Sequence, residues 1–196
     1  MPREPDHWRF NRMPRFPKPY ADAVARLRVT IGFLMVAAFA WFSRPSPDSL
    51  LWGLPVSMLG LALRGWAAGC LAKNQALATG GPYAYTRNPL YLGTVLVAAG
   101  LAVASRSFGL AISFAAVFTL VYLPAIQLEE QHLRKLFRAY PFYETSVPAL
   151  WPRWPRGPAW NGPPFEWRLY FKNREYQAAA GFAVGLLFLL WKARTG

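Results

Sequence analysis

The sequence has little of what a soluble globule needs. Of its 196 residues only 16% are charged, while 54% are hydrophobic. So little charged surface cannot cover a water-soluble domain of this size, and the apolar residues must therefore face something other than water. We expect a single-domain membrane protein.

Cysteine, histidine and acidic residues are also scarce. The one cysteine, Cys70, lies inside an apolar run, which excludes a disulfide framework and a thiolate metal cluster. His7 and His132 are the only histidines, and we expect no metal site. Nine acidic residues face 22 Lys and Arg, which gives a net charge of +13.

That excess would favour nucleic acid as the partner of a soluble protein. Here the basic residues lie almost entirely in connectors between apolar runs, where anionic lipid headgroups attract them. We therefore expect contact with lipid headgroups and no nucleic-acid partner. Residues 1–20 are basic, broken by prolines and free of a contiguous apolar stretch, so we expect no secretory signal.

Five apolar runs predict an all-α fold, a polytopic membrane helical bundle of about five transmembrane helices. The predicted spans are residues 24–42, 50–72, 89–104, 108–128 and 176–191. The third run is short for a full crossing. Ser105, Arg106 and Ser107 form a tight connector after it, which predicts a helical hairpin of the third and fourth spans.

The distribution of Lys and Arg predicts the orientation. If the spans alternate in direction, 17 of the basic residues lie on one side of the membrane and four on the other. The positive-inside rule places the heavier side in the cytoplasm. The basic N-terminal arm (residues 1–23), the connector near residues 73–88 and the stretch 129–175 then share the cytoplasmic face, which is that of the inner membrane if the source is bacterial.

Small residues and prolines mark two further features. Gly65 with Gly69, and Gly181 with Gly185, predict close helix approach within the chain, and a homodimer through these glycine-containing helices is the alternative. Residues 141–167 contain seven prolines and four tryptophans, a composition that resists helix and suits the membrane interface. This stretch is either an anchoring loop or a lid beside a lipid-access opening.

Two polar connectors on the same predicted face carry the chemistry. The first, GGPYAYTRNPLY at residues 80–91, offers backbone amides at two glycines, a guanidinium that pairs with carboxylates, and aromatic rings. The second, EEQHLRKLFRAYPFY at residues 129–143, offers paired carboxylates suited to an ammonium group. S-adenosyl-L-methionine matches this inventory, but a glycine pair with nearby basic residues equally suits a phosphate.

These two segments resemble the isoprenylcysteine carboxyl methyltransferases and their relatives, the phospholipid N-methyltransferases. Members carry G-x-Y...R-H-P-x-Y before a helical hairpin and E-E...L...F-G-x-x-Y-x-x-Y after it. The resemblance covers residues 80–152, with a weaker similarity at 61–74. It implies a membrane methyltransferase that uses S-adenosyl-L-methionine on a lipophilic acceptor.

The resemblance also implies roles for individual residues. The expected cofactor-binding residues are Gly81, Tyr83, Arg87, Asn88, Pro89, Tyr91 and Glu129, of which Glu129 holds the cofactor amine. The expected catalytic residues are Arg87 and Glu130, and the candidate pocket residues are Arg64, Tyr140, Tyr143 and Trp151. Two positions depart from the family: Asn88 replaces its histidine, and Arg138 replaces its glycine.

Alternatives remain open at each level. Arg87 is otherwise an interfacial positive residue, Glu129 and Glu130 are solvated residues at a helix end, and Arg64 either snorkels or has a buried role. The acceptor is a prenylcysteine carboxylate, a phospholipid amine, or a small thiol or quinol. An NADPH-dependent sterol-type reductase and a non-enzymatic membrane scaffold are the rival functions.

Overall fold

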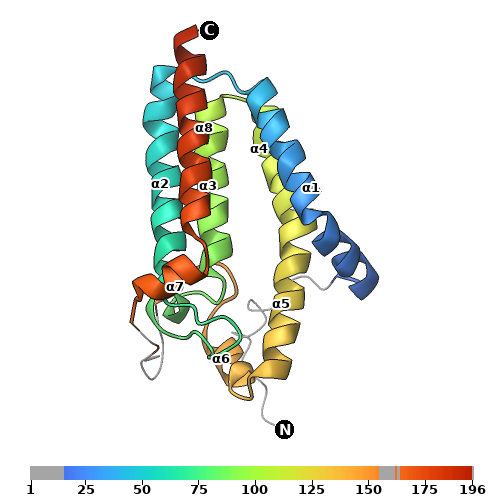
Figure 1. Ribbon diagram of the computed structural model, residues 1–196. Coiled ribbons are helices and arrows are strands. Elements are labelled where there is room, and N and C mark those ends of the chain that lie inside the picture. The colour runs from blue at the N-terminus through green and yellow to red at the C-terminus, as the bar shows by residue number, and fades with distance from the viewer. Residues whose placement is uncertain (1–15, 155–161, 163, 196) are drawn as a thin grey trace.

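The structure is a computed structural model that describes residues 16–154, 162 and 164–195 (Figure 1). Its elements are α1 (Lys18–Phe42), α2 (Pro47–Gly69), the 3₁₀ turn η2 (Gly81–Ala84), α3 (Pro89–Ser105), α4 (Phe108–Val117), the π-helical turn η3 (Phe118–Tyr122), α5 (Leu123–Leu136), α6 (Tyr140–Ser146), α7 (Trp167–Lys172) and α8 (Tyr176–Thr195). No strand occurs among these residues, which confirms the all-α prediction.

Each predicted span coincides with a helix. By length and composition, three helices can cross a membrane: α2, the continuous helix Phe108–Leu136, and α8. The two halves of α1, bent by 55°, make a fourth if they form one span, and α3 is shorter at 17 residues. The protein is therefore an integral membrane protein, and five crossings remain a prediction.

Local sequence sets where the helices begin and end. Ser46 caps α2: its hydroxyl accepts from the Ser49 amide at 3.3 Å, and the Ser49 hydroxyl accepts from the Ser46 amide at 2.9 Å. Arg106 ends α3 in the left-handed conformation, at φ 51°, and Ser107 caps α4. This short connector reverses the chain, as expected.

The tightest helix pair is nevertheless α2 with α3. A Cβ built on Gly60 would lie 2.6 Å from the carbonyl oxygen of Gly93, and one on Gly93 would lie 2.7 Å from that of Gly60. The Ser57 hydroxyl donates to the Val97 carbonyl at 3.1 Å across the same interface. The glycines of α3 therefore face α2, and the contact of α3 with α4, which the predicted hairpin requires, is less extensive.

The glycine pairs named from the sequence have other surroundings. Gly69 faces the ring of Phe165, and Gly65 faces Tyr170 of α7 at 3.6 Å. Gly181 and Gly185 on α8 have nothing within 4 Å of an added Cβ among the described residues. Among the described residues, the prediction that Gly181 and Gly185 pack against another helix of the same chain is wrong. A homodimer contact through these two glycines remains untested.

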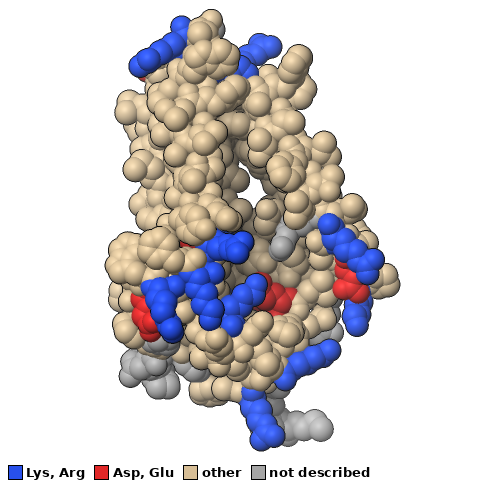
Figure 2. All heavy atoms as spheres, viewed as in Figure 1, with Lys and Arg blue, Asp and Glu red and all other residues tan. Residues whose placement is uncertain are grey.

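The helices form two groups (Figure 1). One group holds α2, α3, α7 and α8, and the other holds α1 against α4, η3 and α5. In the space-filling view an opening separates the groups along part of their length, with acidic side chains in the hollow below it (Figure 2). Lys and Arg side chains gather at the end where α6 and α7 lie (Figures 1 and 2).

Two sequence predictions about this end need correction. The helix through the fourth span continues to Leu136, so Glu129 and Glu130 lie inside α5 and not at its end. The proline-rich stretch 141–167 is not helix-free, because Pro141 occupies the first turn of α6, where a missing N–H costs no hydrogen bond. Residues 155–161 of that stretch, and 1–15 of the basic arm, lie outside the described residues.

Candidate active site

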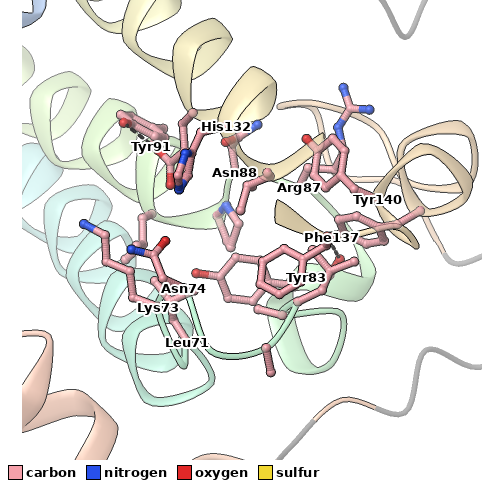
Figure 3. A pocket seen from close by; sticks show the side chains of 18 of the residues that line it. Leu71, Lys73, Asn74, Tyr83, Arg87, Asn88, Tyr91, His132, Phe137 and Tyr140 are labelled. Atoms are coloured by element: carbon pink, nitrogen blue, oxygen red, sulfur yellow. Dashed lines mark hydrogen bonds between the residues drawn. The ribbon is translucent and has the colours of Figure 1, made fainter. Parts of the chain in front are cut away.

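A cavity of about 370 Å³ lies at the end of the molecule that carries α6 and α7 (Figure 3). Its volume is within the range of roughly 300–1,000 Å³ that small-molecule sites occupy. The lining comes from the connector after α2, from η2 with the start of α3, and from α5 with α6. It comprises Leu71, Lys73, Asn74, Ala76, Leu77, Ala78, Tyr83, Arg87, Asn88, Pro89, Leu90, Tyr91, Leu128, Glu129, His132, Leu133, Phe137, Tyr140 and Tyr143.

Two residues with left-handed backbone conformation shape the connector between α2 and η2, which lines one side of the cavity. Asn74 has φ 59°, and Gly81 has φ 57°. Asparagine and glycine tolerate this conformation best. An added Cβ at Gly81 would also lie 2.9 Å from the Cys70 sulfur. Gly81 therefore packs the turn against the end of α2, and it does not line the cavity as predicted.

Hydrogen bonds hold the segment around Thr86 against the segment after α6. The Arg87 amide donates to the Pro148 carbonyl at 2.9 Å, and the Arg153 amide donates to the Tyr85 carbonyl at 3.0 Å. The buried Thr86 hydroxyl lies 3.1 Å from the carbonyls of Ala149 and Leu150. The first motif and residues 148–153, far apart in the chain, are thereby one structural unit.

A buried ion cluster ties this unit to α5. The Arg87 side chain, 2% exposed, lies 3.1 Å from a carboxylate oxygen of Glu130 and donates to the Glu144 carbonyl at 2.9 Å. Glu144 also pairs with the more exposed Arg134. Glu130 is buried and does not line the cavity, while Arg87 does line it, so of the two residues predicted to be catalytic only Arg87 faces the cavity.

The two departures from the family pattern are accommodated. The Asn88 side-chain amide donates to the Ala149 carbonyl at 3.0 Å and lies 3.4 Å from Glu130, so it shares Glu130 as a partner with Arg87. Arg138 is not among the residues with positive φ, so the turn before α6 forms without the left-handed geometry that glycine would permit.

The cavity has a polar end. Glu129 accepts a hydrogen bond from the Tyr91 hydroxyl at 3.0 Å, and both line the cavity. Figure 3 places His132 beside Tyr91, with Lys73 and Asn74 on the same side. Glu129 and His132 are one helical turn apart on α5, which puts both on the face toward the cavity.

Aromatic side chains form the other end, where Figure 3 shows Tyr83, Phe137 and Tyr140. Tyr140 and Tyr143 are fully buried in a cluster with Leu77, Leu133 and Phe137. The Tyr143 hydroxyl donates to the Tyr83 carbonyl at 2.7 Å, whereas the Tyr140 hydroxyl has no partner among the described residues. Burial raises the pKa of Tyr140 and of Tyr143, so both hydroxyls stay protonated.

Two predicted pocket residues lie elsewhere. Arg64 does not snorkel freely: its guanidinium bridges Glu175 at 2.6 and 3.0 Å and donates to Thr94 at 2.5 Å. This cluster joins α2, α3 and the start of α8. The Trp151 side chain is 81% exposed. Neither residue lines the cavity, and their predicted pocket roles stay untested predictions.

The wall at residues 71–78 was missed from the sequence. It supplies Leu71, Lys73, Asn74, Ala76, Leu77 and Ala78 to the cavity. The available signal was an asparagine soon after the last turn of a helix, a position that favours a left-handed turn. Among the described residues, no group of three or more His, Cys, Asp or Glu side chains could hold a metal ion.

Comparison with known proteins bears on this region. Residues 51–140 match the family model described as phospholipid methyltransferase. The match runs from α2 to the first residue of α6 and contains nearly all of the cavity lining. It confirms the resemblance seen in the two motifs.

Two curated relatives are 34% identical to the chain over 106 residues. They are the cobalt-zinc-cadmium resistance protein CzcN of Cupriavidus metallidurans and the nickel-cobalt-cadmium resistance protein NccN of Alcaligenes xylosoxydans xylosoxydans. The alignments cover 51% of this chain and 49% and 50% of the relatives, so the chain spans about half the length of the curated relatives it matches. No solved structure matches.

Proposed function

Because residues 51–140 fit the phospholipid methyltransferase family, we propose that this protein transfers the methyl group of S-adenosyl-L-methionine to a lipophilic acceptor. One observation carries the proposal. The segment 83–91 and Glu129, separated by about forty residues in the chain, line one cavity at the end of the membrane helices. Its polar end suits the amino-acid part of the cofactor, and its aromatic end suits the purine.

The Glu129 carboxylate pairs with the cofactor ammonium, and Tyr91 orients that carboxylate through its hydrogen bond. Arg87 lines the cavity between the two ends, while Glu130, Glu144 and Asn88 hold the Arg87 segment in place. Glu130 is thus a positioning residue.

The reaction is a direct displacement. A nucleophilic atom of the acceptor forms a bond to the sulfonium methyl carbon as the carbon–sulfur bond breaks, and S-adenosylhomocysteine leaves. The positive charge on sulfur disappears in this step, so an apolar, water-poor site favours it. The protein contributes by holding the two reactants in line.

The acceptor reaches the cavity from the bilayer. The opening between the two groups of helices leads toward the hollow that holds the acidic side chains, which supports this route (Figure 2). The cavity faces the cytoplasm, a placement supported by the sequence, which has 17 Lys and Arg in the arm and connectors expected on one face of the membrane against four on the other. Prenylcysteine carboxylates, phospholipid amines and small thiols or quinols are all candidate acceptors.

Ligand binding and label transfer test the proposal. S-adenosylhomocysteine should raise the melting temperature of the purified protein in detergent, because a ligand that binds only the folded state stabilises it. NADPH should not; stabilisation by NADPH alone would favour the reductase, and an effect of neither would favour the scaffold. Methyl-labelled S-adenosyl-L-methionine with a lipid extract of the host should then give a labelled lipophilic product.

A further inference from the structure

His132 lines the cavity from α5 and is exposed, so it remains accessible to a ligand. It makes no hydrogen bond or ion pair with any other residue that the structure describes. A solvated surface histidine needs no explanation, but this one lies beside Tyr91 at the polar end of the cavity (Figure 3).

The second observation comes from the first motif. Asn88 stands where the family pattern has histidine, and its amide is occupied by Ala149 and Glu130. An amide does not carry a proton near neutral pH, whereas an imidazole does. The structure brings His132 to the same cavity as Asn88, and both are labelled in Figure 3.

We propose that His132 accepts the proton of the methyl acceptor, and that the acceptor's attacking atom therefore carries a proton at neutral pH. This inference rests on the proposed function. The acceptor's N–H, S–H or O–H proton goes to an imidazole nitrogen, the freed electron pair forms the bond to the methyl carbon, and the carbon–sulfur bond breaks. Ammonium, thiol and quinol acceptors fit this chemistry, and a carboxylate, which has no proton to lose, does not.

Charged and titratable groups face the same space from every wall. They are Glu129 on α5, Lys73 on the connector after α2, Arg87 and Tyr91 at the start of α3, Tyr83 on η2, and Tyr140 and Tyr143 on α6. His132 is the one histidine among the residues that line the cavity. Histidine is the residue type whose charge ordinarily changes between pH 5 and 8. It is therefore the group suited to exchange a proton reversibly at neutral pH.

The experiment compares the full-length wild-type protein with His132→Asn and with His132→Gln in detergent. Four acceptor probes are offered with labelled S-adenosyl-L-methionine: phosphatidylethanolamine, a long-chain alkanethiol, a quinol and a prenylcysteine carboxylate. Initial rates are measured from pH 5 to 9, and affinity for S-adenosylhomocysteine is measured by calorimetry. Added imidazole serves as chemical rescue.

We expect transfer to a proton-bearing probe at a rate that rises between about pH 5 and 8, the range in which histidine loses its charge. Both variants should lose about 100-fold or more of that rate, a typical contribution of general base catalysis, and lose the pH dependence in that range. Their affinity for S-adenosylhomocysteine should stay unchanged, and imidazole should restore part of the rate.

Transfer to the carboxylate probe alone, or variants that keep the wild-type rate and pH profile, would overturn the inference and leave the proposed function intact. A loss of rate with no change in pH profile and no rescue also contradicts it, because that pattern indicates a structural role. Absence of S-adenosylhomocysteine binding to the wild-type protein would instead defeat the proposed function, and this inference with it.

Discussion

The guanidinium of Arg87 and the carboxylate of Glu130 lie 3.1 Å apart, with only 2% and 8% of their side chains exposed. The pair joins the turn before α3 to α5, and the Glu144 carbonyl at 2.9 Å adds α6. A buried charge needs partners on several sides, because desolvation costs more than one contact returns. The planar fork of arginine meets this need, since its donors point in several directions at once.

Arg87→Lys should therefore lower both stability and methyl transfer. Lysine keeps the charge but cannot reach Glu130 and the Glu144 carbonyl together, so the free energy of unfolding should fall by about 2 kcal/mol, typical of a hydrogen bond to a charged group. Thermal unfolding in detergent measures this. Arg134→Lys is the matched control, because Arg134 also pairs with Glu144 but its side chain is 45% exposed. This substitution should change the free energy of unfolding by less than about 1 kcal/mol.

Glu129→Gln should weaken the binding of S-adenosylhomocysteine by at least about tenfold, or about 1.4 kcal/mol, because it removes the carboxylate that pairs with the ligand ammonium. Calorimetric titration measures the change. Tyr91→Phe removes the hydrogen bond to Glu129 and leaves the charge, so its effect should be smaller. Glu130→Gln should chiefly lower the melting temperature. Unchanged affinity in a folded Glu129→Gln protein would contradict the assignment.

Tyr140→Phe and Tyr143→Phe should differ although both rings are buried on α6. The Tyr143 hydroxyl donates to the Tyr83 carbonyl, so its loss leaves a buried acceptor without this partner and should cost about 1–3 kcal/mol of unfolding free energy. The Tyr140 hydroxyl has no such partner among the described residues, and its removal should leave stability unchanged or raised. Equal melting temperatures of the two variants would show that the Tyr143 hydrogen bond is not significant.

Gly60→Ala should destabilise the protein, because the added methyl carbon would lie 2.6 Å from the backbone oxygen of Gly93 and neither helix backbone yields cheaply. We expect a loss of about 1–3 kcal/mol, measured by thermal unfolding. Gly185→Ala on α8 is the control, since an added Cβ there meets nothing within 4 Å among the described residues. Its effect should be neutral or slightly stabilising, because alanine favours helix over glycine.

Orientation is tested by cysteine labelling of intact cells in a Cys70→Ala background. Probes at Asp48 and Thr195, at the end of the bundle away from the cavity, should react with an impermeant reagent added outside. Probes at Gln75 and Thr145, at the cavity end, should react only after the cells are opened. External labelling at Gln75 would reverse the topology and place the cavity outside the cytoplasm.

The sequence alone determined that the chain is helical and lies in the membrane, because runs of apolar residues with charged connectors permit little else. It also carried the resemblance to the phospholipid methyltransferases, since GPYAYTRNPLY and the Glu129–Tyr143 segment retain the motif residues at their spacing, and residues 51–140 match the model of that family. Tyr83, Arg87, Asn88, Pro89, Tyr91 and Glu129 were named from those motifs, and each lines the cavity.

Tertiary structure alone decided which of the candidates face the cavity. Adjacent residues on a helix point about 100° apart, so Glu129 lines the cavity while Glu130 turns inward to Arg87. Arg64 carries the charge expected of a binding residue, but Glu175, which is 111 positions away, satisfies it outside the cavity. The connector at residues 71–78 has no motif of its own, and only the folding of the chain after α2 places it beside His132 and Tyr91.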